Sequence, residues 1–161
     1  MNAPISIRQV ALPLPGLDAL ALEARRDGHA FVDRLAGDWA KGANRFDRTG
    51  EILLGAFVGT ELAAIGGLNK DPYASDSDDA CARLRHLYVA QAMRRRGIGR
   101  ALVCRLIDVA RPEIRRVSLR AGSPEASAFY LRLGFVPVAE AFATHVLHRP
   151  PRATAFSGSL P

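Results

Sequence analysis

The stretch "VAQAMRRRGIGRALVCRLIDVA", residues 89–110, decides the fold of this chain. Three arginines precede Gly97 and Gly99, and an apolar segment with helical spacing follows at once. The first N–H groups of a helix have no intrahelical acceptor and lie at the positive end of its dipole, and glycine lets a ligand approach the backbone. The stretch therefore predicts a strand, a turn and a helix whose N-terminus binds a pyrophosphate-sized anion. A solvated basic turn is the simpler alternative.

Composition favours one domain. The chain has 161 residues and is 48% hydrophobic, which suffices for one core and is short for two. It has no run of eighteen apolar residues and begins "MNAPISIRQV", so we expect neither a membrane span nor a secretory signal. Cys81 and Cys104 have no metal or redox spacing. We expect two reduced thiols and a cytoplasmic location.

Positive charge is concentrated in one segment. The whole chain carries +6, whereas residues 83–120 hold eleven arginines against Asp108 and Glu113, a net +9, so the remainder is −3. Such a field attracts anions, and the guanidinium stays charged and matches phosphate with a planar fork. A phosphate-bearing partner is expected. The arginines are at positions 83, 85, 94, 95, 96, 100, 105, 111, 115, 116 and 120.

Periodicity and turn residues predict a single α/β domain of order β-α-α-β-β-β-α-β-α-β-β over residues 1–149, with a loose tail at 150–161. Gly66-Gly67 indicates a bend or a close backbone approach, and the acidic segment 69–82 is expected as an exposed loop that could touch a cationic substrate. The predicted strands are 5–12, 51–58, 61–68, 83–89, 116–121, 135–140 and 142–149, and the predicted helices are about 16–27, 30–43, 98–110 and 124–133.

Two common phosphate motifs do not fit. A Walker loop requires Lys-Ser/Thr after its last glycine, and no such pair follows here. The dinucleotide fingerprint requires a third glycine three positions after Gly99, where the chain has Leu102. The motif also lies past the middle of the chain rather than in its first strand–helix unit.

The chain resembles the GNAT family of acyl-CoA-dependent N-acetyltransferases over roughly residues 5–148. The family signature Gln/Arg-x-x-Gly-x-Gly/Ala is matched by residues 94–99, "RRRGIG", after a strand that ends in "LYV", residues 87–89. The second signature, Asn-x-x-Ala-x-x-Phe-Tyr-x-x-x-Gly-Phe, is matched by "SPEASAFYLRLGF", residues 123–135. Two signatures in the correct order make the resemblance specific.

The resemblance implies a fold of the α+β kind: a mixed, mostly antiparallel central sheet with about four helices, splayed between the fourth and fifth strands. Acetyl-CoA would lie in the gap between strands 83–89 and 116–121. The backbone of the first strand would bind the acyl carbonyl and pantetheine, and the turn would bind the diphosphate. The implied cofactor-binding residues are Leu87, Tyr88, Val89, Arg94, Arg95, Arg96, Gly97, Ile98, Gly99 and Arg100.

The resemblance also implies that Tyr130 protonates the departing thiolate. A phenol, with an ordinary pKa near 10, is a neutral donor at pH 7. The alternative is an aromatic residue on the core face of its helix. Ser123 replaces the asparagine of the family signature, and a helix N-cap explains it without a cofactor contact.

The base that deprotonates the amine stays open. Some relatives have a glutamate at the start of the motif-bearing strand, where this chain has Arg83. His86 has a suitable ordinary pKa but alternates to the face opposite Leu87. Glu51, Asp71 and ordered water are the other candidates.

The expected function is therefore transfer of acetyl from acetyl-CoA to a primary amine, by direct attack in a ternary complex. The first alternative is a CoA-binding regulatory module without turnover. The second, nucleic-acid binding, is disfavoured because no aromatic residue interleaves with the arginines between positions 94 and 116. No metal is expected, since His145 and His148 would point to opposite faces of a strand.

Partners follow from the resemblance. The acceptor would be a small molecule or peptide with an amine, bound by residues 20–45, 69–82 and 137–145. Neither nucleic acid nor a membrane is expected as a partner, and dimerisation, common in the family, leaves a homodimer open. The acids at 71–79 would suit a cationic acceptor, although a solvated loop explains them as well.

Overall fold

The computed structural model describes residues 3–75 and 79–150. The order of elements is the predicted one, with a single 3-10 turn added after the fourth strand. All of the expected tail except Pro150 lies outside the described residues. The elements are β1 (Ile5–Gln9), α1 (Leu17–Arg26), α2 (Phe31–Lys41), β2 (Ile52–Val58), β3 (Glu61–Lys70), β4 (Cys81–Val89), η1 (Gln91–Met93), α3 (Ile98–Val109), β5 (Arg116–Leu119), α4 (Pro124–Arg132), β6 (Val136–Pro137) and β7 (His145–His148).

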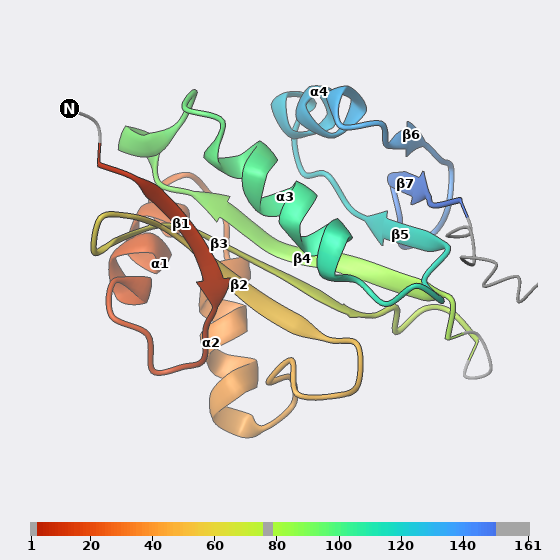
Figure 1. Ribbon diagram of the computed structural model, residues 1–161, viewed down its shortest axis with the longest axis horizontal. Helices are drawn as coiled ribbons and strands as arrows, with labels where there is room; N and C mark the ends of the chain where they lie inside the picture. The colour runs from red at the N-terminus through yellow and green to blue at the C-terminus, as the bar shows by residue number, and fades with distance from the viewer. Residues whose placement is uncertain (1–2, 76–78, 151–161) are drawn as a thin grey trace, which may run out of the picture.

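The strands form one seven-stranded sheet in the order β1-β2-β3-β4-β5-β7-β6, and Figure 1 shows its long central strands running side by side. Every neighbouring pair is antiparallel except β4 and β5, which are parallel. The mixed, mostly antiparallel sheet with four helices is thus confirmed. The outer strands are shorter than predicted. At β6 a proline explains part of this, because Pro137 ends the strand and has no N–H to donate.

Helices cover both faces of the sheet (Figure 1). On one face α3 packs across the central strands, with Ile98, Leu102 and Leu106 almost fully buried. On the other face α1 and α2 bury Leu20, Val32 and their neighbours against β2, β3 and β4. Each helix therefore buries one apolar stripe, as the helical spacing of the sequence predicts.

The central sheet opens between β4 and β5. Their parallel pairing runs only from Cys81 with Arg116 to Arg83 with Ser118. Strand β4 then continues to Val89, whereas β5 ends at Leu119. Among the described residues, the second half of β4 therefore has no strand partner on its β5 side. This is the predicted separation of the fourth and fifth strands.

A bulge shapes β4 where it leaves β5. Ile65 pairs with Tyr88 and Gly67 pairs with Arg85, so β4 has one residue more than β3 over this span. His86 adopts a positive φ of 60° there, a conformation that few side chains other than Asn, Asp and His adopt readily. The bulge kinks the strand next to the opening.

Gly67 lies in the same span and has a packing role. A Cβ at Gly67 would lie 2.3 Å from the Phe46 ring, so the close approach predicted at Gly66-Gly67 is confirmed. The ring of His86 meets the same Phe46 ring edge-on at 6.1 Å. His86 therefore faces the α1–α2 side, while Leu87 packs with the α3 core, as strand alternation predicts.

The expectation of an exposed loop over 69–82 is wrong at both ends, since β4 begins at Cys81 and buries Cys81 and Ala82. Strand β3 extends to Lys70, and both Asn69 and Asp71 are buried. The hydroxyl of Ser118 donates to Asp71 Oδ2 at 2.7 Å, and the N–H of Tyr73 donates to Asp71 Oδ1 at 3.0 Å. These bonds compensate the carboxylate for the water that it loses on burial.

Candidate active site

Helix α3 begins at the opening of the sheet. Gly97 stands before its first residue with a left-handed φ of 75°, and the first intrahelical bond there runs from Ala101 N to Gly97 O. The N–H groups of the first turn, from Ile98 to Arg100, therefore have no intrahelical acceptor. No acidic residue lies in this turn, so the positive end of the helix dipole is left for an outside anion.

The loop before α3 adds further donors. Arg95 has a φ of 63°, so residues 95 and 97 are both left-handed and flank Arg96. Alternating left-handed residues turn neighbouring N–H groups into one concavity that suits an anion. The side chains of Arg95, Arg96 and Arg100 are exposed around it. Binding of a diphosphate by residues 95–100 stays a prediction.

The two signature glycines have different roles. No atom lies within 4 Å of a Cβ built at Gly97, so this glycine leaves the mouth of the helix clear. A Cβ at Gly99 would lie 3.3 Å from Val89 Cγ2 and 3.4 Å from Phe129 Cζ. Gly99 therefore lets β4, α3 and α4 approach one another, rather than only making room for a ligand.

The free edge of β4 presents backbone groups to the opening. The N–H of Ala90 donates to Ala63 O of β3 at 2.8 Å. Because consecutive residues in a strand direct their polar groups to opposite edges, those of Val89 face the β5 side. Arg94 Nε donates to Val89 O at 3.0 Å, which fixes the loop to the end of the strand.

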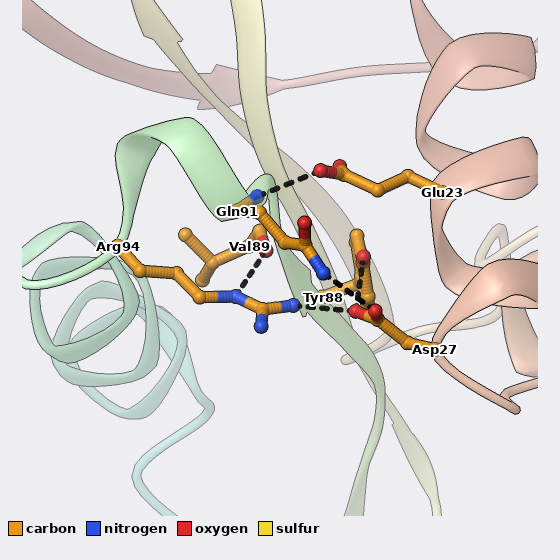
Figure 2. Close-up of polar contacts among 6 residues, drawn as sticks. All are labelled: Glu23, Asp27, Tyr88, Val89, Gln91 and Arg94. Carbon is orange, nitrogen blue, oxygen red and sulfur yellow. Dashed lines mark hydrogen bonds and ion pairs between the residues drawn. The ribbon is translucent and has the colours of Figure 1, made fainter.

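Helix α1 holds this loop from the other side. As Figure 2 shows, Asp27 accepts hydrogen bonds from Tyr88, Gln91 and Arg94, at 2.8, 2.6 and 2.9 Å respectively. Glu23 accepts from the backbone N–H of Gln91 at 3.0 Å. The bond from Tyr88, followed by the one from Arg94, holds the pKa of Asp27 below its usual range. The carboxylate thus joins the strand, the 3-10 turn and the arginine loop.

Two residues that the sequence predicts as cofactor-binding have side chains that already form hydrogen bonds within the protein. The Tyr88 hydroxyl donates to Asp27 at the end of α1, and burial together with this bond raises the Tyr88 pKa. The Arg94 guanidinium is engaged by Asp27 and Val89, unlike the exposed heads of the neighbouring arginines. Direct cofactor contacts of Tyr88 and Arg94 stay predictions. Sequence reasoning missed Asp27, because an acid at a helix end carries no specific signal.

Tyr130 lies on α4 near the end of β5. It is buried, and its ring meets Phe129 and Phe135 edge-on. His145, which pairs with the last residue of β5, has its ring 6.5 Å from that of Tyr130. Burial alone raises the Tyr130 pKa, so the phenol keeps its proton at neutral pH.

The ends of helix α4 are as predicted. The Ser123 side chain accepts from Ala126 N at 3.1 Å as an N-cap, and Pro124 follows at the first position. Gly134, with a φ of 95°, follows the C-terminal end, where the N–H of Phe135 donates to Tyr130 O. Both helix ends that position Tyr130 are thus fixed by local sequence.

Comparison with known proteins agrees with this geometry. The sequence profile of the acetyltransferase (GNAT) family matches residues 18–135. The chain belongs to the GNAT family. The matched range includes nearly all of α1 and the whole of the loop and helix α3, the two parts that Figure 2 shows in contact. No curated protein matches this GNAT chain by sequence.

Solved structures share the GNAT fold. A candidate acetyltransferase from Exiguobacterium sp. 255-15 is 26% identical, with a TM-score of 0.80 over 90% of this chain and 93% of that one. A candidate GNAT acetyltransferase from Desulfovibrio desulfuricans is 20% identical, with a TM-score of 0.69 over 90% and 99%. Arabidopsis thaliana NAA60, solved with a bisubstrate analogue, is 17% identical, with a TM-score of 0.61 over 89% and 95%.

The candidate bases of this GNAT protein differ in their hydrogen-bond partners and burial. Glu51 Oε2 accepts from Asn69 Nδ2 at 2.7 Å and from the N–H of Lys70 at 3.1 Å. Asp71 is held by Ser118 and Tyr73, as described above. His86 is buried, and neither ring nitrogen makes a hydrogen bond of good geometry within the described residues, although the Phe31 backbone approaches the ring as an acceptor. Burial, followed by the charge of Arg85, lowers the His86 pKa from 6.5 to about 4.

Two of the three segments assigned to the acceptor meet in the structure. Residues of 71–74 and 140–143 line a pocket over the paired halves of β4 and β5. Arg83, which stands where some relatives have glutamate, forms part of this pocket. The third segment, residues 20–45, contains most of α1 and all of α2, which pack together on one face of the sheet.

Neither a metal centre nor a membrane helix occurs in the described part of this GNAT chain. Across residues 3–75 and 79–150, no three His, Cys, Asp or Glu side chains gather closely enough to hold a metal ion. His145 is buried between Ser127 and Thr144, whereas His148 is exposed, so the two histidines diverge as predicted. The helices of these residues are too short or too polar to cross a bilayer.

The Asp27 network yields a first prediction. In Asp27→Asn the charge is lost, and an amide cannot accept all three hydrogen bonds with one oxygen. We expect the KM for acetyl-CoA to rise about tenfold, because a hydrogen bond to a charged group contributes about that factor, while kcat changes little. Steady-state kinetics with varied acetyl-CoA measures both constants. Asp33→Asn, which breaks only an exposed ion pair with Arg25, is the matched control. A fall in kcat at constant KM would contradict a positioning role.

His86 yields a second prediction, on stability. Its folded pKa of about 4 lies below the ordinary 6.5, so the unfolded chain binds the proton first. The contribution of His86 to the free energy of unfolding is complete above pH 6.5. It is lost as the pH falls toward 4, and the total loss is roughly 3 kcal/mol. Denaturant unfolding at pH 7 and pH 4.5 should show this loss. In His86→Asn, which suits the positive φ, the loss should shrink. In the exposed His148→Asn it should not, and equal pH dependence in all three proteins would refute the assignment.

Proposed function

We propose that this GNAT protein transfers an acetyl group from acetyl-CoA to a primary amine. The observation that carries the proposal is the juxtaposition of the α3 N-terminus with the unpaired edge of β4. The first offers backbone donors and arginines to a diphosphate, and the second offers strand hydrogen bonds to an extended chain. Family membership supports acetyl-CoA as the cosubstrate.

The residues fit this cosubstrate. The peptide N–H groups between Arg95 and Arg100 would bind the diphosphate, with the guanidinium groups around them. The backbone of Leu87 and Val89 would bind the pantetheine arm and hold the acyl carbonyl. Bound there, acetyl-CoA supplies an acetyl group activated as a thioester. The protein's contribution is to fix the orientation of that group toward the amine.

Tyr130 would donate a hydrogen bond to the sulfur as the thiolate leaves, and the proton that the nitrogen releases on forming the amide would finally reach that thiolate. An ordinary thiol pKa of about 8.5 lies well below that of a phenol, so the hydroxyl serves by stabilising the sulfur as charge develops on it. Burial supports this role, because it raises the Tyr130 pKa and keeps the donor protonated.

Ordered water fits best as the route by which the amine loses its proton. Glu51 and Asp71 already accept hydrogen bonds from the protein. His86 stays neutral at pH 7 but, with a pKa of about 4, is a weak base. Neutral amine would thus attack after its proton leaves to solvent. The rate should then rise with pH toward the pKa of the amine itself.

A second candidate function is CoA binding without turnover. The observation that favours it is Arg83, which occupies the position of the glutamate base of some relatives and is buried. In this case the protein would bind CoA at the anion site but would not catalyse acetyl transfer.

One experiment separates the two candidates. The protein is incubated with acetyl-CoA and a panel of primary amines, and released thiol is followed with a chromogenic disulfide while mass spectrometry detects the acetylated amine. Amine-dependent thiol release with a matching product is expected. CoA binding without thiol release from any amine would favour the binding module. A reaction lacking protein corrects for spontaneous acetylation.

A further inference from the structure

A small pocket lies on the α1–α2 side of the sheet, where β4 and β5 are still paired. Its volume is about 110 Å³, which leaves room for a carboxylate and a few waters but not for a whole acceptor. Residues 71–74, after β3, and residues 140–143, between β6 and β7, form its walls. The lining residues are Asp71, Tyr73, Ala74, Arg83, Arg116, Glu140, Ala141, Phe142 and Ala143.

Arg83 brings an unsatisfied donor to this pocket. Its side chain is only 8% exposed, and Nη2 donates to Phe142 O at 2.8 Å. Nη1 is buried and has no hydrogen-bond partner among the described residues. Burial lowers the Arg83 pKa from its ordinary 12.5, yet arginine keeps its proton in proteins. Leaving a buried cationic N–H without an acceptor raises the free energy of the folded protein. A ligand that supplies this acceptor would therefore gain binding free energy.

The acids of the pocket are already paired. Asp71 accepts from the Ser118 hydroxyl and from the N–H of Tyr73. Glu140 forms an ion pair with Arg116. Among the described residues that line the pocket, Arg83 Nη1 is thus the buried side-chain atom that lacks a hydrogen-bond partner, and it requires an acceptor such as a carboxylate oxygen. Asp79 is likewise paired, with Lys70, whereas Asp76 and Asp78, the other acids behind the sequence hint of a cationic acceptor, lie outside the described residues.

Aromatic side chains flank the donor. The rings of Tyr73 and Phe142 stack at 4.1 Å between centroids, and both residues are more than half exposed. The Arg83 guanidinium lies 4.9 Å from the Tyr73 ring centroid. The pocket thus combines a buried charge with an exposed apolar wall, which suits a carboxylate at the end of a hydrocarbon chain.

The pocket lies within reach of the proposed reaction centre. On β4, Leu87 is four residues beyond Arg83, about 13 Å along an extended strand and less through the bulge. On the other wall, Phe142 is three residues from His145, whose ring neighbours that of Tyr130. A ligand held at Arg83 would therefore extend along β4 toward the acetyl group, with its amine several bonds from its carboxylate.

We infer that this pocket binds the carboxylate of the acceptor, so that the substrate class is amines carrying a carboxylate at the far end of an apolar chain. Arg83 Nη1 donates to the carboxylate, and the stacked Tyr73 and Phe142 contact the chain. The inference rests on the proposed acetyl transfer and specifies its acceptor.

The test compares ω-amino acids, from 4-aminobutanoate to 8-aminooctanoate, with their primary amides. Each pair has the same amine, length and shape and differs only in charge. In the wild-type protein kcat/KM should be at least tenfold higher for the longer acids than for their amides, the size of a charge-assisted hydrogen bond. Equal values for acid and amide at every length would overturn the inference without recourse to any variant.

Arg83→Gln provides the second arm. The acid-over-amide preference should disappear, while the KM for acetyl-CoA stays within about threefold of wild type. Arg83→Lys, which keeps the charge and loses the planar fork, should retain part of the preference. Arg115→Gln, an exposed arginine that donates to Pro112 O, is the matched control. A preference that survives in Arg83→Gln would show that another group reads the carboxylate.

Direct binding separates failure of the pocket from failure of the enzyme. If no amine is acetylated, 8-aminooctanoate and octylamine are titrated by calorimetry into the protein saturated with CoA. Binding of the amino acid at least tenfold tighter than the amine, lost in Arg83→Gln, would uphold the pocket while the proposed turnover falls. Equal affinities would overturn the pocket.

Discussion

Replacing Tyr130 by Phe should reduce kcat at least 100-fold while leaving CoA affinity within about threefold of wild type. The substitution removes one oxygen and keeps the buried ring that meets Phe129 and Phe135. A positioned general acid accelerates a reaction by about 10²–10⁴-fold. The fall in kcat should lie at the lower end of this range if a water molecule takes the place of the hydroxyl. The measurement is single-turnover thiol release with saturating acetyl-CoA and amine.

Folding and binding must be shown to be intact in Tyr130→Phe. Thermal unfolding should give a melting temperature close to that of wild type, and calorimetry should give a similar Kd for CoA. Because burial raises the Tyr130 pKa, the phenol stays protonated up to pH 9. The kcat of the wild-type protein should therefore not fall between pH 7 and pH 9. Turnover within threefold of wild type would remove Tyr130 from the mechanism and return it to a core aromatic residue.

Replacing Gly97 by Val should weaken CoA binding more than 100-fold. The φ of 75° at this position suits glycine and strains a β-branched residue by about 1–2 kcal/mol. The space around a Cβ there is open, so the valine would not clash inside the protein. It would instead stand in front of the N–H groups that are to bind the diphosphate. Calorimetric titration with CoA measures the loss.

Gly59→Val is the matched control for Gly97→Val. Gly59 has a φ of 60° in the β2–β3 turn, and a Cβ there would come no nearer than 3.8 Å to Ala3. Both substitutions cost backbone strain, and only one blocks the α3 N-terminus. Similar losses of stability with a large difference in CoA affinity are expected. Equal CoA affinities in the two variants would mean that the anion site lies elsewhere.

Local sequence sufficed for the elements that hold the anion site. The turn from β4 to α3 depends on glycines and on a helical apolar stripe, and both can be read within about twenty residues. The ends of α4 were predictable for the same reason, since Ser123 and Gly134 act on their own helix. The separation of β4 and β5 followed from the family resemblance, whereas their parallel direction became known only from the structure.

Long-range contacts could not be predicted in this way. Asp27 meets Arg94 and Tyr88 across more than sixty residues of chain, and no pattern in either segment indicates the other. The bulge that turns His86 toward Phe46 depends on the register of β3. Asp71 seemed part of a solvated acidic loop, because its bond to Ser118 joins residues that are far apart in sequence. The Arg83 pocket was hidden for the same reason.

The most direct test of the central claim is to compare CoA with pantetheine by calorimetry. The backbone N–H groups around Gly97 are proposed to bind the diphosphate, which pantetheine lacks. We expect CoA to bind with measurable heat, dephospho-CoA (which keeps the diphosphate) to bind nearly as well, and pantetheine to bind at least 100-fold more weakly. No heat with CoA, or equal affinities for CoA and pantetheine, would contradict diphosphate binding at Gly97.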